Sequence, residues 1–169
     1  MKIVSFDPSS TICGYAVIET IGMKVLEAGL LKPDRVADPA NDRIRAMVRD
    51  AAALVAEQDP SLIVIEDTTG KVARRHGGSG AGLAIYGKAI GWLASTCERI
   101  RPGQVRLVLE NEWTGGAPKS RRFLHIQAMA IGLDFSGDKG GDARDAVGVG
   151  LYIARKIADS GAELGIPAL

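Results

Sequence analysis

Apolar residues recur along this chain with two different periods, and the change of period separates the expected strands from the expected helices. Residues 2–6, 13–19 and 23–31 are short, mostly aliphatic runs joined by brief turns. Runs of this kind are typical of strands, and turns this short join antiparallel neighbours. The first part of the chain therefore predicts a three-stranded antiparallel meander.

After residue 40 the pattern alternates between helical spacing and single apolar runs. Helices are predicted over residues 40–57, 80–98, 118–131 and 142–159, and strands over residues 61–66 and 105–109. A crossover through the first helix sets strand 61–66 parallel to one of the first three strands. This order predicts the α/β class: a five-stranded mixed sheet, three antiparallel strands then two parallel ones, flanked by helices. The length predicts a single domain over residues 1–169.

Composition places the chain among ordinary globular proteins. Apolar residues make up 46% of the chain and charged residues 24%, and neither a long apolar span nor a signal-peptide pattern is present. With only two cysteines, Cys13 and Cys97, a disulfide scaffold is not expected. These features predict a cytoplasmic protein with no membrane association.

The net charge of +1 conceals an uneven distribution. Between Lys71 and Arg122 there are ten basic residues and three acidic ones, a net charge of +7 that leaves −6 for the remainder. A basic segment in an otherwise acidic chain is what a polyanion-binding face beside an acidic site would show. Basic helix faces exposed to solvent would give the same count, so both interpretations stay open.

Two acids end predicted strands. Asp7 follows the first apolar run, and Glu66 closes the run "SLIVIE". If the two strands are parallel neighbours, both carboxylates lie at carboxyl ends about one strand spacing apart, ~5 Å. Ligands of open α/β sheets favour that edge.

Two further acids begin the last predicted helix. Asp142 and Asp145 are three residues apart, which places both on one helix face. Taken singly, the four acids have simple explanations: a turn, an exposed strand end, and capping of a helix N-terminus. Brought together they would repel one another by ~4 kcal/mol per pair at intermediate dielectric, so shared protons or divalent cations are expected. Oxygen ligands without His or Cys indicate Mg²⁺ or Mn²⁺, and a pair of such ions suits attack on a phosphodiester.

The segments "IVSFDPSSTICGYAVIE", "LIVIED" and "GGDARDAVGVGLYIA" resemble, in order and spacing, the RuvC-type Holliday-junction resolvases of the ribonuclease H-like (retroviral integrase) superfamily, which has bacteriophage members. The resemblance implies a homodimeric, metal-dependent endonuclease that cuts branched DNA, in a bacterial cell or in a host cytoplasm. It implies that two Mg²⁺ ions, or Mn²⁺ in their place, are held by Asp7, Glu66, Asp142 and Asp145 as catalytic residues. It also makes Lys119, in "APKSRR", a candidate for phosphate contact or charge stabilisation.

The chain departs from the family pattern in two places. The family's loop after the strand-end glutamate often carries an aromatic residue, whereas "DTTGKVARRHGGSG" has none. Phosphate contacts are expected instead from basic residues in two segments: Lys71, Arg74, Arg75 and His76, and Lys119, Arg121 and Arg122. Residues 110–116 have no secure family counterpart, so Trp113 is either a core or interface anchor or a base-stacking residue.

The predicted helix 80–98 has too few polar positions for an ordinary surface helix. A row of small residues lies beside its apolar stripe: Gly80, Ala84, Gly87 and Gly91. Glycine inside a helix is unfavourable by up to ~1 kcal/mol relative to alanine, so close approach of another backbone is expected here. That neighbour is either the chain itself or a second copy, and a two-fold dimer matches the way the family cuts a two-fold junction.

Three functions remain open from the sequence: a metal-dependent structure-selective endonuclease, a non-catalytic nucleic-acid-binding relative of the same fold, and an actin-like ATPase. The last is raised by "DPSST", which resembles a phosphate hairpin, but a second subdomain has no room in this length. ATP turnover would favour the ATPase, and DNA binding without cleavage in Mg²⁺ would favour the binding relative.

Overall fold

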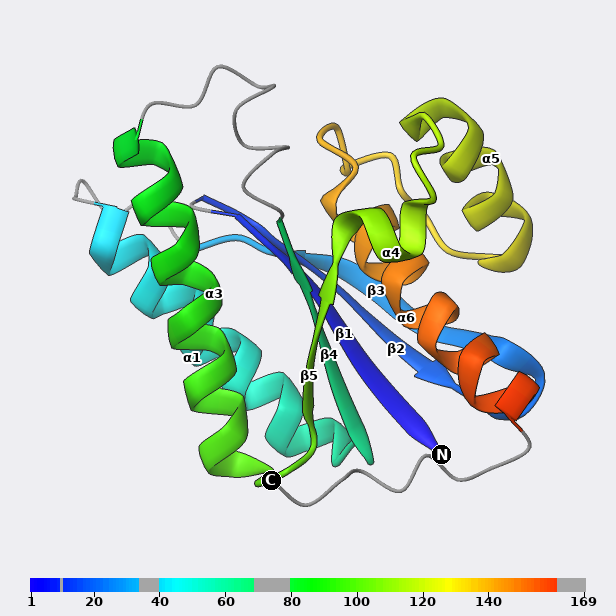
Figure 1. Cartoon of the computed structure of the whole chain (residues 1–169), viewed down its shortest axis with the longest axis horizontal. Coiled ribbons are helices and arrows are strands. Elements are labelled where there is room, and N and C mark those ends of the chain that lie inside the picture. The colour runs from blue at the N-terminus through cyan, green and yellow to red at the C-terminus, as the bar shows by residue number, and fades with distance from the viewer. Residues whose placement is uncertain (10, 34–39, 69–79, 161–169) are drawn as a thin grey trace.

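The computed structural model describes residues 1–9, 11–33, 40–68 and 80–160. Five strands form one sheet in the order β3-β2-β1-β4-β5 (Figure 1). The strands are β1 (Lys2–Pro8), β2 (Cys13–Glu19), β3 (Lys24–Leu31), β4 (Leu62–Asp67) and β5 (Val105–Leu109). The pairs β1–β2 and β2–β3 are antiparallel, whereas β1–β4 and β4–β5 are parallel. The predicted mixed five-stranded sheet is confirmed.

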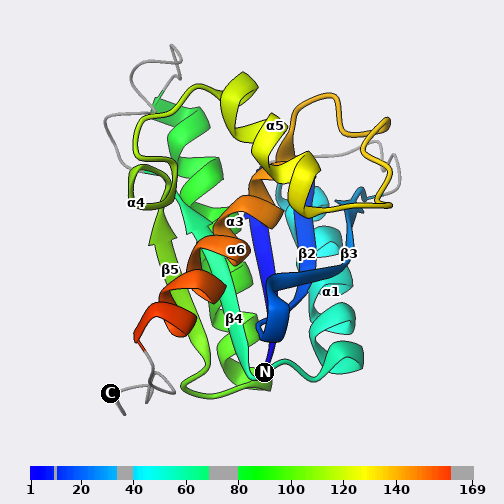
Figure 2. The ribbon, with the colours of Figure 1, turned by 90° about the vertical axis from the view of Figure 1, so that its right-hand side faces the viewer.

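Helices cover both faces of this sheet (Figures 1 and 2). Helices α1 (Ala40–Gln58) and α3 (Gly80–Ile100) lie on one face. Helix α6 (Asp142–Ser160) lies on the other, with α4 (Glu110–Thr114) and α5 (Lys119–Met129) beside it. A 3₁₀ turn, η1 (Ile21–Met23), joins β2 to β3. No helix among the described residues is long and apolar enough to cross a membrane.

A hydrophobic core lies on each face of the sheet, and β1 contributes side chains to both. Val4 and Phe6 face the layer of α1 and α3, whereas Ile3 and Ser5 face α6. Successive strand residues point to opposite faces, and β1 is central, so a continuous apolar run is buried on both sides. Asp7, the penultimate residue of this central strand, therefore lies between two helical layers.

Helix α6 packs closely on the sheet because small residues line its contact face. Ser5 is fully buried, and its hydroxyl donates a 2.7 Å hydrogen bond to the carbonyl oxygen of Ala146. A Cβ at Gly150 would lie 2.5 Å from the Ser5 Oγ and from the Ile18 Cδ1. The three residues expected to dock this helix, Val149, Leu151 and Ile153, are all buried. This close packing determines where the first turn of α6 lies relative to the strand ends.

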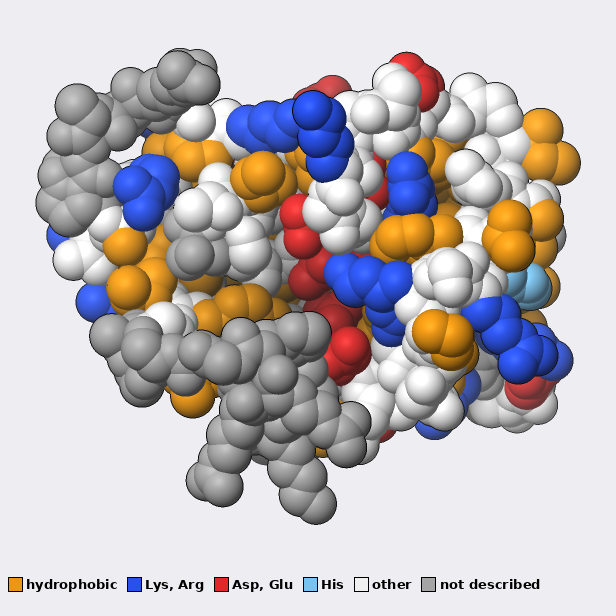
Figure 3. Space-filling model, turned by 90° about the horizontal axis from the view of Figure 1, so that it is seen from above, with side chains coloured by type: hydrophobic (Ala, Val, Ile, Leu, Met, Phe, Trp, Pro, Cys, Tyr) orange, Lys and Arg blue, Asp and Glu red, His pale blue; other side chains and the backbone are white. Residues whose placement is uncertain are grey.

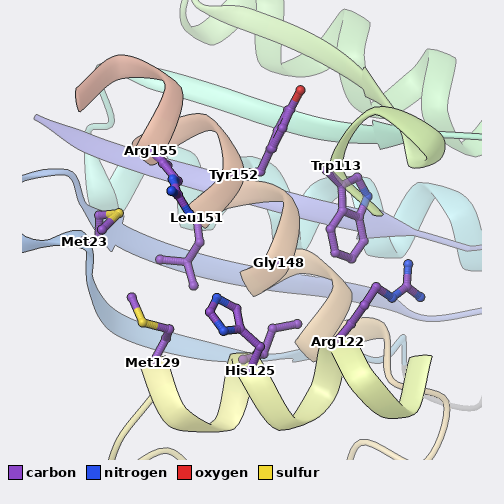
Figure 4. Close-up of a pocket in the computed structure, with 10 residues that line it drawn as sticks. Met23, Trp113, Arg122, His125, Met129, Gly148, Leu151, Tyr152 and Arg155 are labelled. Carbon is purple, nitrogen blue, oxygen red and sulfur yellow. The ribbon is translucent and has the colours of Figure 1, made fainter. Parts of the chain in front are cut away.

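One α-helix was not predicted. Residues 110–114 form the short helix α4 directly after β5. Trp113 in α4 packs against the core under α6, and a Cβ at Gly148 would lie 2.5 Å from its ring (Figure 4). Trp113 is thus an anchor of α4 on α6, the first of the two roles expected for it.

Candidate functional site

Asp7 and Glu66 lie at the carboxyl ends of neighbouring parallel strands. The register pairs Phe6 with Ile65, so the next residues along β1 and β4 are the two acids. Glu66 is only 5% exposed, and its Oε2 has no hydrogen-bond partner. An unpaired buried carboxylate oxygen is strongly unfavourable unless it is protonated or binds a cation. The expected placement of the two acids at one sheet edge is therefore what the structure has.

The first turn of α6 carries Asp142 and Asp145 to the same edge. Gly14 in β2 is the strand partner of Asp7. A Cβ at Gly14 would overlap the Asp142 carbonyl group, so only glycine allows α6 to begin this close to the sheet. Asp145 is 4% exposed and Asp142 is half-buried. Figure 3 shows acidic side chains in a central band on this face, with basic side chains beside them.

Electrostatic coupling joins the four predicted acids. Burial raises the pKa of Asp7 well above its ordinary value, and the charges of Glu66, Asp145 and Asp142 raise it further. Burial, followed by repulsion from Asp145 and Glu110, raises the pKa of Glu66 to about 8. The pKa of Asp142 is raised as well, mainly by burial. The charge of Asp145 is close enough to raise the pKa of each of the other three acids.

Two basic residues of α5 balance part of this charge. The Lys119 Nζ lies 2.9 Å from the Asp145 Oδ2 and donates a hydrogen bond of 3.2 Å to the Gly140 carbonyl oxygen. Partial burial opposes the charge of Lys119, but the hydrogen bond and attraction to Asp145 outweigh it, and the Lys119 pKa is raised. An Arg122 terminal nitrogen lies 3.4 Å from the Asp145 Oδ1.

Arg122 differs from the expectation. It was expected to contact DNA, but it is only 9% exposed, and its guanidinium stacks 4.7 Å from the Trp113 ring centroid (Figure 4). The side chain is directed inward to Asp145 because α5 packs on α6 along this face. Arg122 therefore holds an acid of the site and is not presented to a DNA backbone. Arg121, its neighbour, is exposed.

The chemistry of the donor set fits divalent cations, although the side chains do not converge on one point. All four predicted ligands are carboxylates, the donors that Mg²⁺ and Mn²⁺ prefer. The Glu66 Oε2, which has no hydrogen-bond partner, is available to a cation. Within the described ranges, no three His, Cys, Asp or Glu side chains are grouped closely enough to hold an ion as they stand. Asp145 is instead held by Lys119 and Arg122.

The remaining predicted residues fall into two groups. Lys71, Arg74, Arg75 and His76 lie outside the described residues. Gly80 is the first residue of α3, while Ala84, Gly87 and Gly91 form an exposed face of that helix. A Cβ at Gly87 or Gly91 would meet no described atom within 4 Å. The described part of the chain therefore does not cover this face.

Two residues near the site were not identified from the sequence. Nothing in the sequence indicated the role of Gly14 beyond its position opposite Asp7 in a hairpin. Asp138 is 4% exposed and accepts hydrogen bonds from backbone N–H groups at the start of α6. The sequence did offer one signal for Asp138: it is an acid inside the glycine-rich stretch 137–141, just before the Asp142–Asp145 pair.

A first test of this geometry is Gly14→Ala. We expect the added methyl group to displace the first turn of α6, because it would overlap the Asp142 backbone. The DNA cleavage expected from the sequence should fall by about 100-fold or more, since displacements of about 1 Å cost that much in catalysis. The rate is measured in a single turnover at saturating DNA. Gly137→Ala is the control, because a Cβ there meets no described atom within 4 Å and the backbone φ is not positive, and equal rates for both variants would contradict the prediction.

Comparisons with known proteins agree with this fold. No protein-family model matches the chain. The crossover junction endodeoxyribonuclease RuvC of Trichlorobacter lovleyi is 30% identical over 69 residues, a match that spans 40% of this chain and 38% of that protein. The chain thus matches well under half the length of this curated relative.

Two solved structures are similar over nearly the whole chain. Thermus thermophilus RuvC in complex with a Holliday junction substrate has a TM-score of 0.74 at 18% identity, covering 95% of this chain and 96% of that one. The Fowlpox virus resolvase in complex with Holliday junction DNA has a TM-score of 0.57 at 16% identity, covering 93% and 99%. The ribonuclease H-like fold and the resemblance to RuvC-type resolvases are confirmed.

Proposed function

We propose that this chain is a metal-dependent, structure-selective DNA endonuclease that cuts Holliday (four-way) or related branched junctions by paired phosphodiester hydrolysis. The observation that carries the proposal is the gathering of four carboxylates at one sheet edge, with a buried Glu66 oxygen that has no partner. The fold of two junction-bound resolvases supports it. We propose that residues 1–169 act as one nuclease domain, cytoplasmic in a bacterial cell or an infected host, in recombination, repair or phage DNA processing.

In this proposal Asp7, Glu66, Asp142 and Asp145 would hold two Mg²⁺ ions, with Mn²⁺ as a substitute. Bound ions of this kind supply a Lewis acid and an activated water for phosphodiester hydrolysis. Asp7 and Glu66 are supplied by rigid strands, and the helix supplies the aspartates, so the backbone positions of the four acids would keep their spacing while their side chains turn to the ions. Each carboxylate would offer an oxygen ligand from a backbone position fixed by its strand or helix.

Lys119 and Arg122 have separate proposed roles. Lys119 is half-exposed beside Asp145, so its ammonium is free to turn to a phosphate or to stabilise the charge that develops there. Arg122 is buried and keeps Asp145 oriented. Exposed Arg121, together with Lys71, Arg74, Arg75 and His76, is proposed to contact backbone phosphates. Their charge would position the DNA without reading its sequence.

A labelled four-way junction tests the proposed function. With Mg²⁺ or Mn²⁺ we expect paired nicks near the branch point and none on a linear duplex of the same sequences. Calcium should support binding with little cleavage, because its looser coordination does not hold an in-line geometry well. Junction binding without cleavage in Mg²⁺ and Mn²⁺ would favour a non-catalytic relative. Equal cleavage of the linear duplex and the junction would contradict the proposed structure selectivity.

The second proposed partner is another copy of the chain. The face of α3 formed by Ala84, Gly87 and Gly91 is not covered by the described residues and lacks side-chain bulk. Two such faces can approach closely, and a two-fold dimer would present two sites to a two-fold junction.

Gly87→Glu tests the dimer. Two like charges would meet across the two-fold axis at a cost of several kcal/mol, so we expect the dimer dissociation constant to rise by about 100-fold or more. Sedimentation velocity at micromolar concentration measures it. Leu124→Glu, which places the same charge on the exposed surface of α5, should leave the dimer intact. A native chain that sediments as a monomer, with and without a junction, would contradict the prediction.

A further inference from the structure

The start of α6 is capped in an unusual way. The Asp145 N–H donates to the Gly141 carbonyl oxygen at 2.8 Å, which makes Gly141 the residue at the helix cap position. A side chain at that position normally accepts a hydrogen bond from the second or third helical N–H group. Glycine has no such side chain. Its φ of +87° and the nearby Phe123 ring, which a Cβ would overlap, leave no room for one.

Asp138 takes over this capping role from the preceding loop. Its Oδ1 accepts hydrogen bonds from the backbone N–H groups of Gly141 at 3.0 Å and Ala143 at 3.3 Å. Its Oδ2 accepts from the Arg144 N–H at 3.1 Å. Ala143 and Arg144 are the second and third residues of α6. Asp138 thus holds the two N–H groups that a cap side chain would bind.

The Asp138 carboxylate is itself held in place. Its side chain is 3% exposed, and the Arg144 Nε lies 3.8 Å from the Oδ2. The Arg144 guanidinium also donates to the Phe135 carbonyl oxygen at 3.2 Å and stacks 4.8 Å from the centroid of the Phe123 ring. A buried charge with several donors and an ion-pair partner keeps one orientation. The cap is therefore rigid.

This arrangement bears directly on the two aspartates of the site. Capping would be the simplest explanation for Asp142 and Asp145 at a helix start, but Asp138 already binds the N–H groups concerned. The Asp145 carboxylate is directed to Lys119 and Arg122 instead. Ala143 and Arg144, whose N–H groups bind Asp138, lie between the two aspartates, so Asp138 holds the backbone turn that carries both side chains.

We infer that Asp138 is a positioning residue that caps α6 from the loop and so holds the helical turn that presents Asp142 and Asp145 to the proposed metal site. The inference rests on the proposed function for its catalytic consequence. Partners one step removed from a metal typically change metal affinity or activity by about 10–100-fold when they are altered.

The test compares Asp138→Asn with Asp134→Asn. Asn retains one acceptor oxygen but places an NH₂ group toward the Arg144 N–H or the other donors. Asp134 lies four residues earlier in the same loop, is exposed, and accepts hydrogen bonds from Ser136.

In the DNA-free protein we expect Asp138→Asn to raise amide exchange at Ala143 and Arg144 and to lower Mn²⁺ affinity by about 10–100-fold. With DNA, the single-turnover rate at saturating junction should fall similarly, while junction affinity in Ca²⁺ stays within about twofold. Asp134→Asn should match the native chain throughout.

A role in stability alone would give a different result. It would lower the melting temperature of Asp138→Asn but leave Mn²⁺ affinity and the saturated rate unchanged at a temperature where the variant is folded. That outcome would overturn the inference. So would an equal loss of Mn²⁺ affinity and cleavage rate in Asp134→Asn, or a native chain that binds no Mn²⁺. A native chain that binds Mn²⁺ but cuts no junction would overturn only the proposed function, because exchange and Mn²⁺ affinity still decide the role of Asp138. Should Asp138→Asn fail to fold, Asp138→Glu retains the charge and is measured by the same titration.

Discussion

Asp7→Asn should reduce junction cleavage by about 10³-fold or more while leaving junction affinity equal or better. Loss of one catalytic group in a cooperating set has effects of this size or larger. Asp7 lies at the end of the central strand, and its charge is coupled to Glu66, Asp145 and Asp142. Asparagine keeps the shape of the side chain but removes a charged ligand, and it also relieves repulsion toward phosphate. Cleavage is measured in a single turnover with Mg²⁺, and affinity separately in Ca²⁺.

The matched control is Asp159→Asn, which removes a carboxylate from the exposed last turn of α6. It should cut at the native rate. Native-like cleavage by Asp7→Asn would contradict the metal-site proposal. Loss of junction binding by that variant would indicate that Asp7 contributes to the DNA interface or to folding and does not act only in the reaction.

Glu66→Gln should stabilise the metal-free protein at pH 8. The Glu66 pKa rises from an ordinary value of 4.5 to about 8 in the folded chain, mainly through burial. The folded state therefore keeps a proton that the unfolded state has released. The resulting stability is fully present below about pH 4.5 and is lost as the pH rises toward 8. Glutamine cannot ionise, so it avoids this loss, which is worth roughly 2–4 kcal/mol at the upper end.

Thermal unfolding across this pH range measures the effect. Relative to the native chain, Glu66→Gln should gain about 5 °C or more in melting temperature at pH 8, and the difference should shrink toward pH 4.5. Mg²⁺ should raise the melting temperature of the native chain more than that of the variant, because a ligand stabilises the state that binds it. Glu57→Gln, on the exposed surface of α1, is the control. A variant no more stable than the native chain at pH 8 would contradict the raised pKa.

The sequence by itself determined the layout of the fold. Buried strands and helices must present apolar residues with periods of two and 3.6, so the runs at 2–6 and 61–66 and the spaced residues of α1 revealed their elements directly. The helix between those two runs required β4 to lie parallel to one of the first three strands. The structure shows that this strand is β1, which places Asp7 beside Glu66. The placement of the four acids was predictable only jointly, because each has a simple explanation by itself but the predicted sheet brings them to one edge. The register follows from the same apolar pattern.

Tertiary structure decided the features that depend on side-chain direction and on contacts between residues distant in sequence. Arg122 counts as one more positive charge in the basic segment, but packing of α5 on α6 directs it inward to Asp145. Helix α4 has five residues, too few for a periodic signal, and it depends on Trp113 meeting Gly148. The capping role of Asp138 arises only because Gly141 adopts a positive φ beside Phe123. Periodicity reports which residues are buried, whereas these three features depend on which atoms meet once the layers have packed.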